Sequence, residues 1–324
     1  MNPFESYLYI ASGAADGGIY AYKMTSDGRT EPLAEYPLGK TMYLAVQGNR
    51  LYALAAVSAD NNGWLFSFSI EEDGRLRRTG EALPTRGKEA CHLWPDGDMV
   101  YCVNYDSAGI IRMPDRLVTH TGRSVHPERQ SDPHPHYICV TPDGNYCCAV
   151  DLGLDKILVY DKALHPVSEV NAPAGYGPRH LVFSQDGRTA FCTNELISSV
   201  SVYAYDNGHL SLLRTVSTLP EDYTGESYAA AIRLSSDGRF LFVSNRGHDS
   251  ICCFEVDGTS LTRRSISPCG GHWPRDFILT DSLLICTNEL SGTVTFFRRE
   301  GCILTPLTEN LSIPTAQAAL AVQA

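Results

Sequence analysis

The stretch YICVTPDGNYCCAV, residues 137–150, places two short apolar runs on either side of a Pro-Asp-Gly turn. Each run has the length of a strand, and Asp-Gly favours the tight turn of an antiparallel hairpin. The same pattern recurs at residues 43–56, 91–104, 180–194, 231–245 and 277–288. The turns lie near Gly48, Gly97, Gly144, Gly187, Gly238 and Ser282, so the period is 43 to 51 residues. The sequence therefore predicts a repeat protein with one such hairpin in every unit.

A second turn follows the hairpin in most units. It reads SDGR from residue 26, EEDGR from 71, DNGH from 206, VDGT from 256 and REGC from 299. Each unit is thus predicted to hold four antiparallel strands, A to D, within about 40–50 residues. This arrangement is typical of a β-propeller blade.

The two ends of the chain complete one further unit. The segments YLYIASGA, GGIYAYKM and TEPLAEY near the N-terminus read as strands B, C and D without a strand A before them. The C-terminal segment PTAQAALAV reads as an inner strand without a partner after it. If this strand joins the N-terminal blade, it closes the ring and covers an exposed sheet edge. We therefore predict an all-β, seven-bladed propeller forming a single domain over residues 1–324, in preference to an open solenoid of strands.

Composition narrows the classes of partner. The formal net charge of −11 and the pI of about 5.3 argue against binding to nucleic acid or to an anionic membrane surface. The longest apolar run, LYALAAV, is far shorter than the roughly 20 residues of a membrane span. The first residues, MNPFESYLYIASG, lack the pattern of a secretory signal, so we expect a cytoplasmic protein. The oligomeric state is not indicated.

The 11 cysteines show no CxxC spacing, and two pairs are adjacent within strand-like runs. Neighbouring strand residues point to opposite faces, so these pairs suit neither a disulfide nor a metal clamp. We expect reduced cysteines that act as small buried hydrophobic residues.

Blade topology predicts which loop residues converge. In a propeller the D–A and B–C connections share one face, and the residues just before each strand A approach the central axis. On the D–A side these residues are Lys40, Lys88, His136, Arg179 and Arg275. On the B–C side they are Asp151, Glu195, Arg246, His248 and Glu289.

Any single cation on this rim is readily interpreted as a solvated loop residue. Five blades that place a cation at the same step instead favour an anion-binding pocket. Alternatives remain open for individual residues: His136, in the HPH motif, can simply hold a proline-containing loop rigid, and Glu195 and Glu289 can form structural ion pairs. His180, directly after Arg179, suits packing or a supporting hydrogen bond.

Several classes of chemistry leave no signature. The chain has no GxSxG elbow, HExxH pair, phosphate-binding loop or dinucleotide fingerprint, and no cluster with calcium or zinc spacing. We therefore expect a site without metal or cofactor.

Three segments resemble the lactonase family of seven-bladed propellers, which includes propeller-type 6-phosphogluconolactonases and carboxymuconate-lactonizing enzymes. They are HPHYICVTPDGNYCCAVDLGLDKILVYD, GPRHLVFSQDGRTAFCTNEL and DGRFLFVSNRGHDSI, and the similarity extends over essentially the whole chain. The resemblance implies a metal-free site of one His, two Arg and one Glu, which match His136, Arg179, Arg246 and Glu195. Two features depart from it: Glu289 stands where Gln is usual, and residues 110–130 are irregular.

The resemblance implies hydrolysis of a small anionic sugar lactone, with 6-phosphogluconolactone as the expected substrate. Glu195 or His136 is the expected general base, and Arg179 and Arg246 are expected to stabilise the oxyanion or to hold the substrate. The other expected substrate-binding residues are Lys40, Lys88, His180, His248, Arg275 and Glu289. A muconate-type cycloisomerase and a non-catalytic propeller that binds a metabolite or protein are the alternatives.

Overall fold

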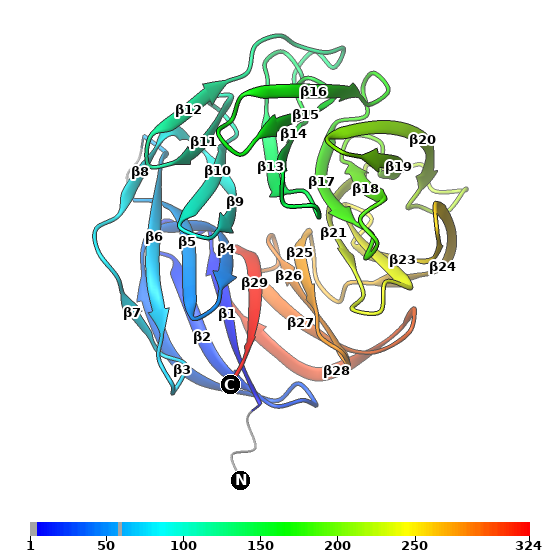
Figure 1. Cartoon of the computed structure of the whole chain (residues 1–324). Helices are drawn as coiled ribbons and strands as arrows, with labels where there is room; N and C mark the ends of the chain where they lie inside the picture. The colour runs from blue at the N-terminus through cyan, green and yellow to red at the C-terminus, as the bar shows by residue number, and fades with distance from the viewer. Residues whose placement is uncertain (1–4, 58–59) are drawn as a thin grey trace.

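The computed structural model describes residues 5–57 and 60–324. Its strands form seven antiparallel sheets arranged around a central axis (Figure 1). The prediction of a seven-bladed propeller is therefore confirmed. Residues 1–4 and 58–59 lie outside the described residues, and a single domain over residues 1–324 stays a prediction. No helix within the described ranges is long and apolar enough to cross a membrane.

Six blades hold four strands and blade 2 holds five, and the inner strand is given first here. Blade 1 has β29 (Ala316–Gln323), β1 (Ser6–Ser12), β2 (Gly18–Met24) and β3 (Thr30–Pro37); blade 2 has β4 (Lys40–Gln47), β5 (Arg50–Ala56), β6 (Asn62–Ile70) and β7 (Leu76–Arg78), with β8 (Leu83–Lys88) also paired to β6; blade 3 has β9 (Ala90–Asp96), β10 (Met99–Asn104), β11 (Gly109–Met113) and β12 (Arg116–Thr119). Blade 4 has β13 (Pro135–Val140), β14 (Tyr146–Asp151), β15 (Lys156–Asp161) and β16 (Pro166–Asn171); blade 5 has β17 (Pro178–Phe183), β18 (Thr189–Asn194), β19 (Ser199–Asp206) and β20 (His209–Ser217); blade 6 has β21 (Tyr228–Leu234), β22 (Phe240–Arg246), β23 (Ser250–Asp257) and β24 (Ser260–Pro268); blade 7 has β25 (Pro274–Leu279), β26 (Leu283–Asn288), β27 (Thr293–Glu300) and β28 (Ile303–Ser312).

The ring closes as the sequence predicts. The last strand, β29, pairs antiparallel with β1, and Tyr9 lies opposite Leu320 (Figure 1). Ala318 and Ala319 on β29 are buried. The closing strand therefore covers the edge of β1 and contributes to the core, as an inner strand should.

The blades are held together by apolar side chains between their faces. Phe242 of blade 6, for example, packs in one buried cluster with Phe277 and Cys286 of blade 7. Polar links also join the blades, and one of them is made by Tyr9, whose hydroxyl donates to the Gly74 carbonyl oxygen of blade 2 at 2.7 Å. Non-directional apolar burial between sheets is thus the main cohesion of the ring.

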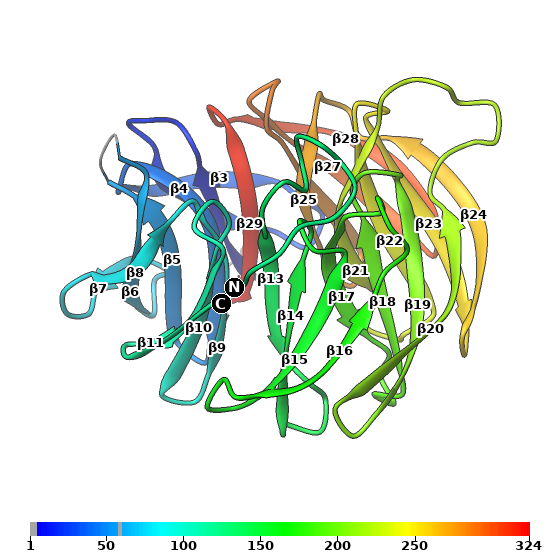
Figure 2. The ribbon, with the colours of Figure 1, turned by 90° about the horizontal axis from the view of Figure 1, so that it is seen from above.

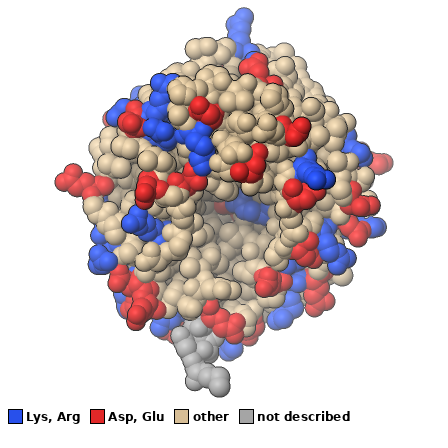
Figure 3. Space-filling model, in the orientation of Figure 1, with Lys and Arg blue, Asp and Glu red and all other residues tan. Residues whose placement is uncertain are grey.

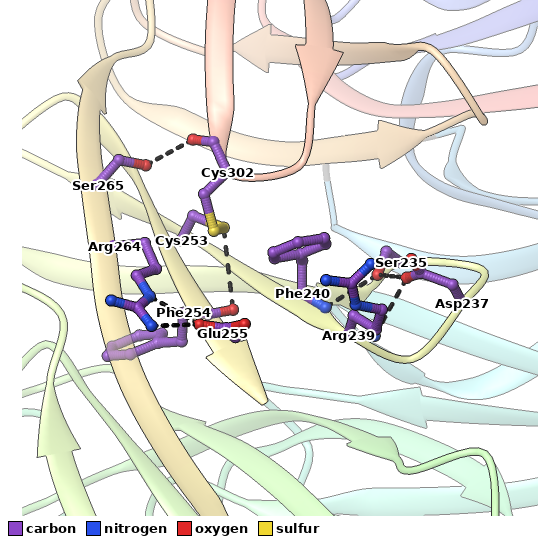
Figure 4. Close-up of a disulfide and its surroundings, with 10 residues drawn as sticks. All are labelled: Ser235, Asp237, Arg239, Phe240, Cys253, Phe254, Glu255, Arg264, Ser265 and Cys302. Atoms are coloured by element: carbon purple, nitrogen blue, oxygen red, sulfur yellow. Dashed lines mark hydrogen bonds and ion pairs between the residues drawn. A yellow bond between two sulfur atoms is a disulfide. The ribbon is translucent and has the colours of Figure 1, made fainter. Parts of the chain in front are cut away.

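The cysteines correct one expectation. Nine are free and buried, but Cys253 of β23 and Cys302 of the β27–β28 turn form a disulfide between blades 6 and 7 (Figure 4). Their Cα atoms are 5.5 Å apart, within the range a disulfide spans. The sequence did not reveal this pairing because the two residues are 49 positions apart and meet only through the packing of neighbouring blades.

The two faces of the ring differ. In Figure 2 the β13–β14 turn lies on the lower side, and the connection from β12 to β13 arches over the upper side. Because strands alternate in direction, the D–A and B–C connections of every blade share that upper side. All the candidate site residues of the sequence therefore belong to one face.

Removing residues 316–324 tests the closure. This deletion takes away β29, exposes the edge of β1 and opens the apolar layer between blades 1 and 7. We expect the midpoint of thermal unfolding, followed by circular dichroism, to fall by at least about 10 °C. Deleting only the exposed residues 323–324 is the matched control, and equal midpoints for the two variants would show that ring closure contributes little.

Candidate active site

In four blades a buried asparagine is the last or the next-to-last residue of strand B. Asn104, Asn194, Asn245 and Asn288 are all fully buried. Their side-chain amides bond to hydroxyl groups nearby: Asn194, for example, donates to Ser199 and Ser201 at 2.8 and 2.9 Å. Each asparagine fixes the end of its strand, so the following residue is delivered to the same rim. These following residues are Tyr105, Glu195, Arg246 and Glu289.

The repeated CTNEL sequence thus has a structural meaning. In each copy the asparagine closes the strand and the glutamate points to the functional face. Glu195 is further held by its own N–H, which donates to the Gly177 carbonyl oxygen at 2.7 Å. Gly177 has φ +62°, and an added Cβ would lie 2.6 Å from Leu196, so glycine is needed there.

A pocket of about 240 Å³ opens on this face. Its lining residues are Glu89, Cys91, Tyr105, Asp106, Arg129, His136, Glu195, Arg246 and Arg275. Four of the residues predicted from the sequence therefore line one cavity, although they come from four different blades. Arg179 lies next to this cavity as a direct partner of Glu195.

Three arginines surround Glu195. Its Oε2 is 3.0 Å from Arg179 Nε and 2.7 Å from Arg246 Nη2, while its Oε1 is paired with Arg129 Nη2. Arg246 also donates from Nε to the Tyr228 carbonyl oxygen at 3.3 Å and stacks over Trp273. One negative charge thus meets three positive ones, which leaves a local excess of two positive charges.

The cluster determines the ionisation of Glu195. Burial alone would raise the pKa of this carboxyl, but the charges of Arg246, Arg179 and Arg129 hold it well below the ordinary 4.5. Because the pKa is lower in the folded chain than in the unfolded one, this carboxylate stabilises the fold above pH 4.5 and less as the pH falls. Burial and the charge of Arg246 lower the pKa of Arg179 to about 9, so Arg179 remains protonated at neutral pH.

His136 has the opposite character. It is buried, and its Nδ1 has no hydrogen-bond partner among the described residues. Burial and the nearby charge of Arg179 lower the pKa of His136 well below 6.5, so the ring is neutral at neutral pH. A neutral imidazole on the wall of a cavity is able to accept a proton.

His180 contacts two residues of the site, Arg179 and His136. Its Nε2 lies 3.2 Å from Arg179 Nη1, and its ring packs against His136 with centroids 5.2 Å apart. Burial and Arg179 hold the pKa of His180 well below 6.5 as well. It is placed to orient Arg179 and does not line the pocket.

The remaining predicted cations have separate positions. Arg275 lines the pocket and donates from Nη1 to Glu289 Oε2 at 3.3 Å. Lys40 pairs with Glu89 at 3.2 Å. Lys88 is exposed and His248 bonds to Ser250, and neither lines the pocket. The rim therefore brings together only part of the set that blade topology suggests.

Arg129 is the residue that sequence reasoning missed. It comes from the β12–β13 connection (residues 120–134), which lies outside the blade repeat. The irregularity of residues 110–130 was the one signal in the sequence, but it did not indicate that a side chain would reach Glu195.

The described residues offer little for metal or thiol chemistry. Among them, no group of three or more His, Cys, Asp or Glu side chains is arranged to hold a metal ion. Cys91 lines the pocket, but burial raises the pKa of its thiol to about 12, so it stays protonated at neutral pH. An activated cysteine nucleophile is therefore not available there.

The opposite end of the central channel is different. It forms a cavity of about 470 Å³ whose walls are mainly apolar residues of the inner strands, with Arg233 as its charged lining residue. Arg233 is bound to Asp276 at 2.7 Å. Figure 3 shows a central hollow with largely uncharged walls and Lys or Arg atoms deep within it. Among the described residues that line this cavity, no group of arginines surrounds a carboxylate as it does at Glu195.

Comparison with known proteins places this geometry in a family. Residues 7–320 match the model of the family described as "Lactonase, 7-bladed beta-propeller". The chain is 32% identical to the 6-phosphogluconolactonase of Bacillus subtilis, with 97% of each chain covered. The chain therefore belongs to the seven-bladed β-propeller lactonases, a family of lactone-hydrolysing enzymes.

Solved structures agree. A structure of a 6-phosphogluconolactonase from Bacteroides fragilis, assigned as such provisionally, has a TM-score of 0.89 and 25% identity, with 98% of each chain covered. A periplasmic gluconolactonase from Pseudomonas aeruginosa has a TM-score of 0.89 and 28% identity, with 98% of this chain and 99% of that chain covered. The resemblance seen in the sequence is thus confirmed.

Replacing Glu195 with Gln tests the importance of the cluster. The substitution keeps the shape of the side chain but removes the negative charge that lies among three guanidinium groups. We expect the free energy of unfolding in urea to fall by about 3–5 kcal/mol, as when one partner of a buried ion pair is removed. The control is Glu169→Gln, since Glu169 is 51% exposed and pairs with Lys156 on the surface; that change should stay within about 1 kcal/mol. Equal losses in both variants would contradict this account of the cluster.

Proposed function

We propose that this protein hydrolyses 6-phosphogluconolactone to 6-phosphogluconate without a metal ion, in the pentose phosphate pathway of the cytoplasm. The observation that carries the proposal is that a neutral His136, whose Nδ1 has no hydrogen-bond partner among the described residues, lines the same pocket as Glu195 and its cluster. In that cluster three arginines share one carboxylate, which leaves an excess of two positive charges. The histidine supplies a base, and the cluster supplies binding for an anionic substrate. The names of the B. subtilis and B. fragilis relatives support the same substrate.

In the proposed reaction a water molecule attacks the ring carbonyl carbon while the His136 imidazole on the pocket wall accepts its proton. The carbonyl oxygen becomes an oxyanion, and Arg246 on the pocket wall stabilises it with N–H groups that Glu195 and Tyr228 leave unengaged. The carbon–oxygen ring bond then breaks, and the imidazolium returns the proton to the departing ring oxygen. The product is an open-chain hydroxy acid.

The geometry supports His136 over Glu195 as the proposed base. Glu195 is bound to three guanidinium groups and has a strongly lowered pKa, so it is a weak proton acceptor. We propose that Glu195 instead positions Arg179 and Arg246. Arg179, which does not line the pocket, holds Glu195 from behind, while Arg275 is a candidate for contact with the polar substituents of the substrate.

The first experiment is an assay on freshly prepared 6-phosphogluconolactone, with gluconolactone in parallel and EDTA in both. The lactone opens spontaneously, so the measured quantity is the rate above the blank. We expect rapid, EDTA-resistant hydrolysis of the phosphorylated lactone. A rate equal to the blank on both lactones would refute the proposal and favour a cycloisomerase or a binding protein. EDTA-sensitive turnover would refute the absence of a metal.

Replacing His136 with Asn tests the base. General-base catalysis contributes about 100- to 10,000-fold, so we expect kcat to fall at least about 100-fold. In the unmodified protein, the lowered pKa keeps His136 neutral as the pH falls through 6.5, so kcat/KM should decline only in more acidic solution. His209→Asn, in an exposed C–D turn, is the control and should leave both quantities unchanged. Normal turnover by His136→Asn would remove His136 from the mechanism.

A further inference from the structure

The β12–β13 connection is built as a rigid arm over the pocket. Gln130 is fully buried and donates from Nε2 to the Leu152 carbonyl oxygen at 2.8 Å. Ser124 Oγ donates to Asp155 Oδ2 at 2.5 Å, and His120 Nδ1 lies 2.6 Å from the buried Asp151 Oδ2. The arm is thus fastened to blade 4 at its start, middle and end.

This arm presents Arg129 between two walls of the pocket. The guanidinium donates from Nη2 to the Tyr105 hydroxyl at 3.5 Å, and its central carbon lies 6.0 Å from the centre of the Tyr228 ring. The Arg129 side chain is 35% exposed, compared with 2% for Arg179 and 7% for Arg246. Of the three arginines around Glu195, Arg129 is therefore the one that faces an incoming ligand.

The ion pairs show which cation is able to change partners. If Arg129 leaves Glu195, the carboxylate keeps Arg179 and Arg246, so no buried charge is left alone. If Arg275 left Glu289, or Lys40 left Glu89, each carboxylate would lose the ion-pair partner that the structure gives it. The other two carboxylates on the pocket wall do not change which cation is able to leave its partner, because Glu89 is bound by Lys40 and Asp106 is exposed.

We propose that Arg129 selects the anionic substituent of the substrate: its guanidinium leaves Glu195 Oε1 and binds two oxygens of a phosphate group carried by the lactone. The inference rests on the proposed lactone hydrolysis and adds the residue that distinguishes a phosphorylated sugar lactone from a neutral one. Arg129 is a specificity residue, while His136 and Arg246 act at the ring carbonyl. The planar guanidinium fork suits two phosphate oxygens, and the excess of two positive charges suits a dianion.

The test compares Arg129→Gln with the unmodified protein on two substrates, 6-phosphogluconolactone and gluconolactone. We expect the ratio of kcat/KM for the phosphorylated over the neutral lactone to fall about 10- to 100-fold, the value of hydrogen bonds to a charged group. Arg129→Lys keeps the charge without the fork and should recover part of the ratio. Arg123→Gln removes an exposed charge from the same connection and should leave the ratio unchanged.

A ratio that stays constant in Arg129→Gln overturns the inference, whether both rates fall together or neither changes. Binding of 6-phosphogluconate, followed by isothermal titration calorimetry, separates this outcome from a failure of the proposed function. If the unmodified protein hydrolyses neither lactone, the proposed function fails, while a Kd at least tenfold weaker in Arg129→Gln than in Arg123→Gln still supports a phosphate contact. Equal Kd values in the two variants, or the absence of binding to the unmodified protein, overturn it.

Discussion

The ion cluster around Glu195 is the constraint on which the functional face depends. A carboxylate this deeply buried is tolerated because its guanidinium partners occupy both oxygens. Arg179 comes from blade 5, Arg246 from blade 6 and Arg129 from the connection between blades 3 and 4. One side chain therefore links three segments that are distant in the sequence, and the arginines keep their places only while the carboxylate is ionised.

The ring makes such a cluster possible. In four blades packing and a buried asparagine fix the end of strand B, so the residue after Asn194 and the residue after Asn245 meet near the axis with little freedom. The positions of these site residues are thus set by the blade repeat. Substitution at the one position after each asparagine changes the chemistry of the rim without altering the blade that carries it.

The sequence predicts the fold well because its signals are local. Asp-Gly turns and short apolar runs define each hairpin, and the unpaired segment at 314–322 predicts closure with β1. Blade topology also places His136, Glu195, Arg246 and Arg275 on one face, and all four line one pocket. It overestimates the set, since Lys88 and His248 share that face but lie outside the pocket: the position of a residue in a blade fixes its face, but not the direction of a long side chain.

What the sequence does not reveal depends on contacts between units. Arg129 belongs to a connection without a repeat pattern, and only its hydrogen bonds to blade 4 bring it over Glu195. The Cys253–Cys302 disulfide likewise follows from the packing of two neighbouring blades. Asp151 shows the reverse error: it reads as a rim carboxylate, but it takes the place of the strand-ending asparagine and is buried against His120.

The charge of the whole molecule opposes the approach of an anion, so the anion binding that we propose must depend on local charge. With a net charge of −11, the protein repels anions at long range, but this repulsion is screened within about 10 Å at ordinary ionic strength. Inside the pocket the dielectric is lower, and the three guanidinium groups that share the single carboxylate of Glu195 act at short distance. Nearly every cation on this face already has a carboxylate partner, so charge alone does not suffice for binding. A ligand must also bring oxygens that fit the guanidinium of Arg129, the arginine that is able to leave its carboxylate. In the proposed scheme the chemistry at the ring carbonyl and the recognition of the substituent belong to different side chains, so that a change at Arg129 would alter the preferred lactone without altering the reaction.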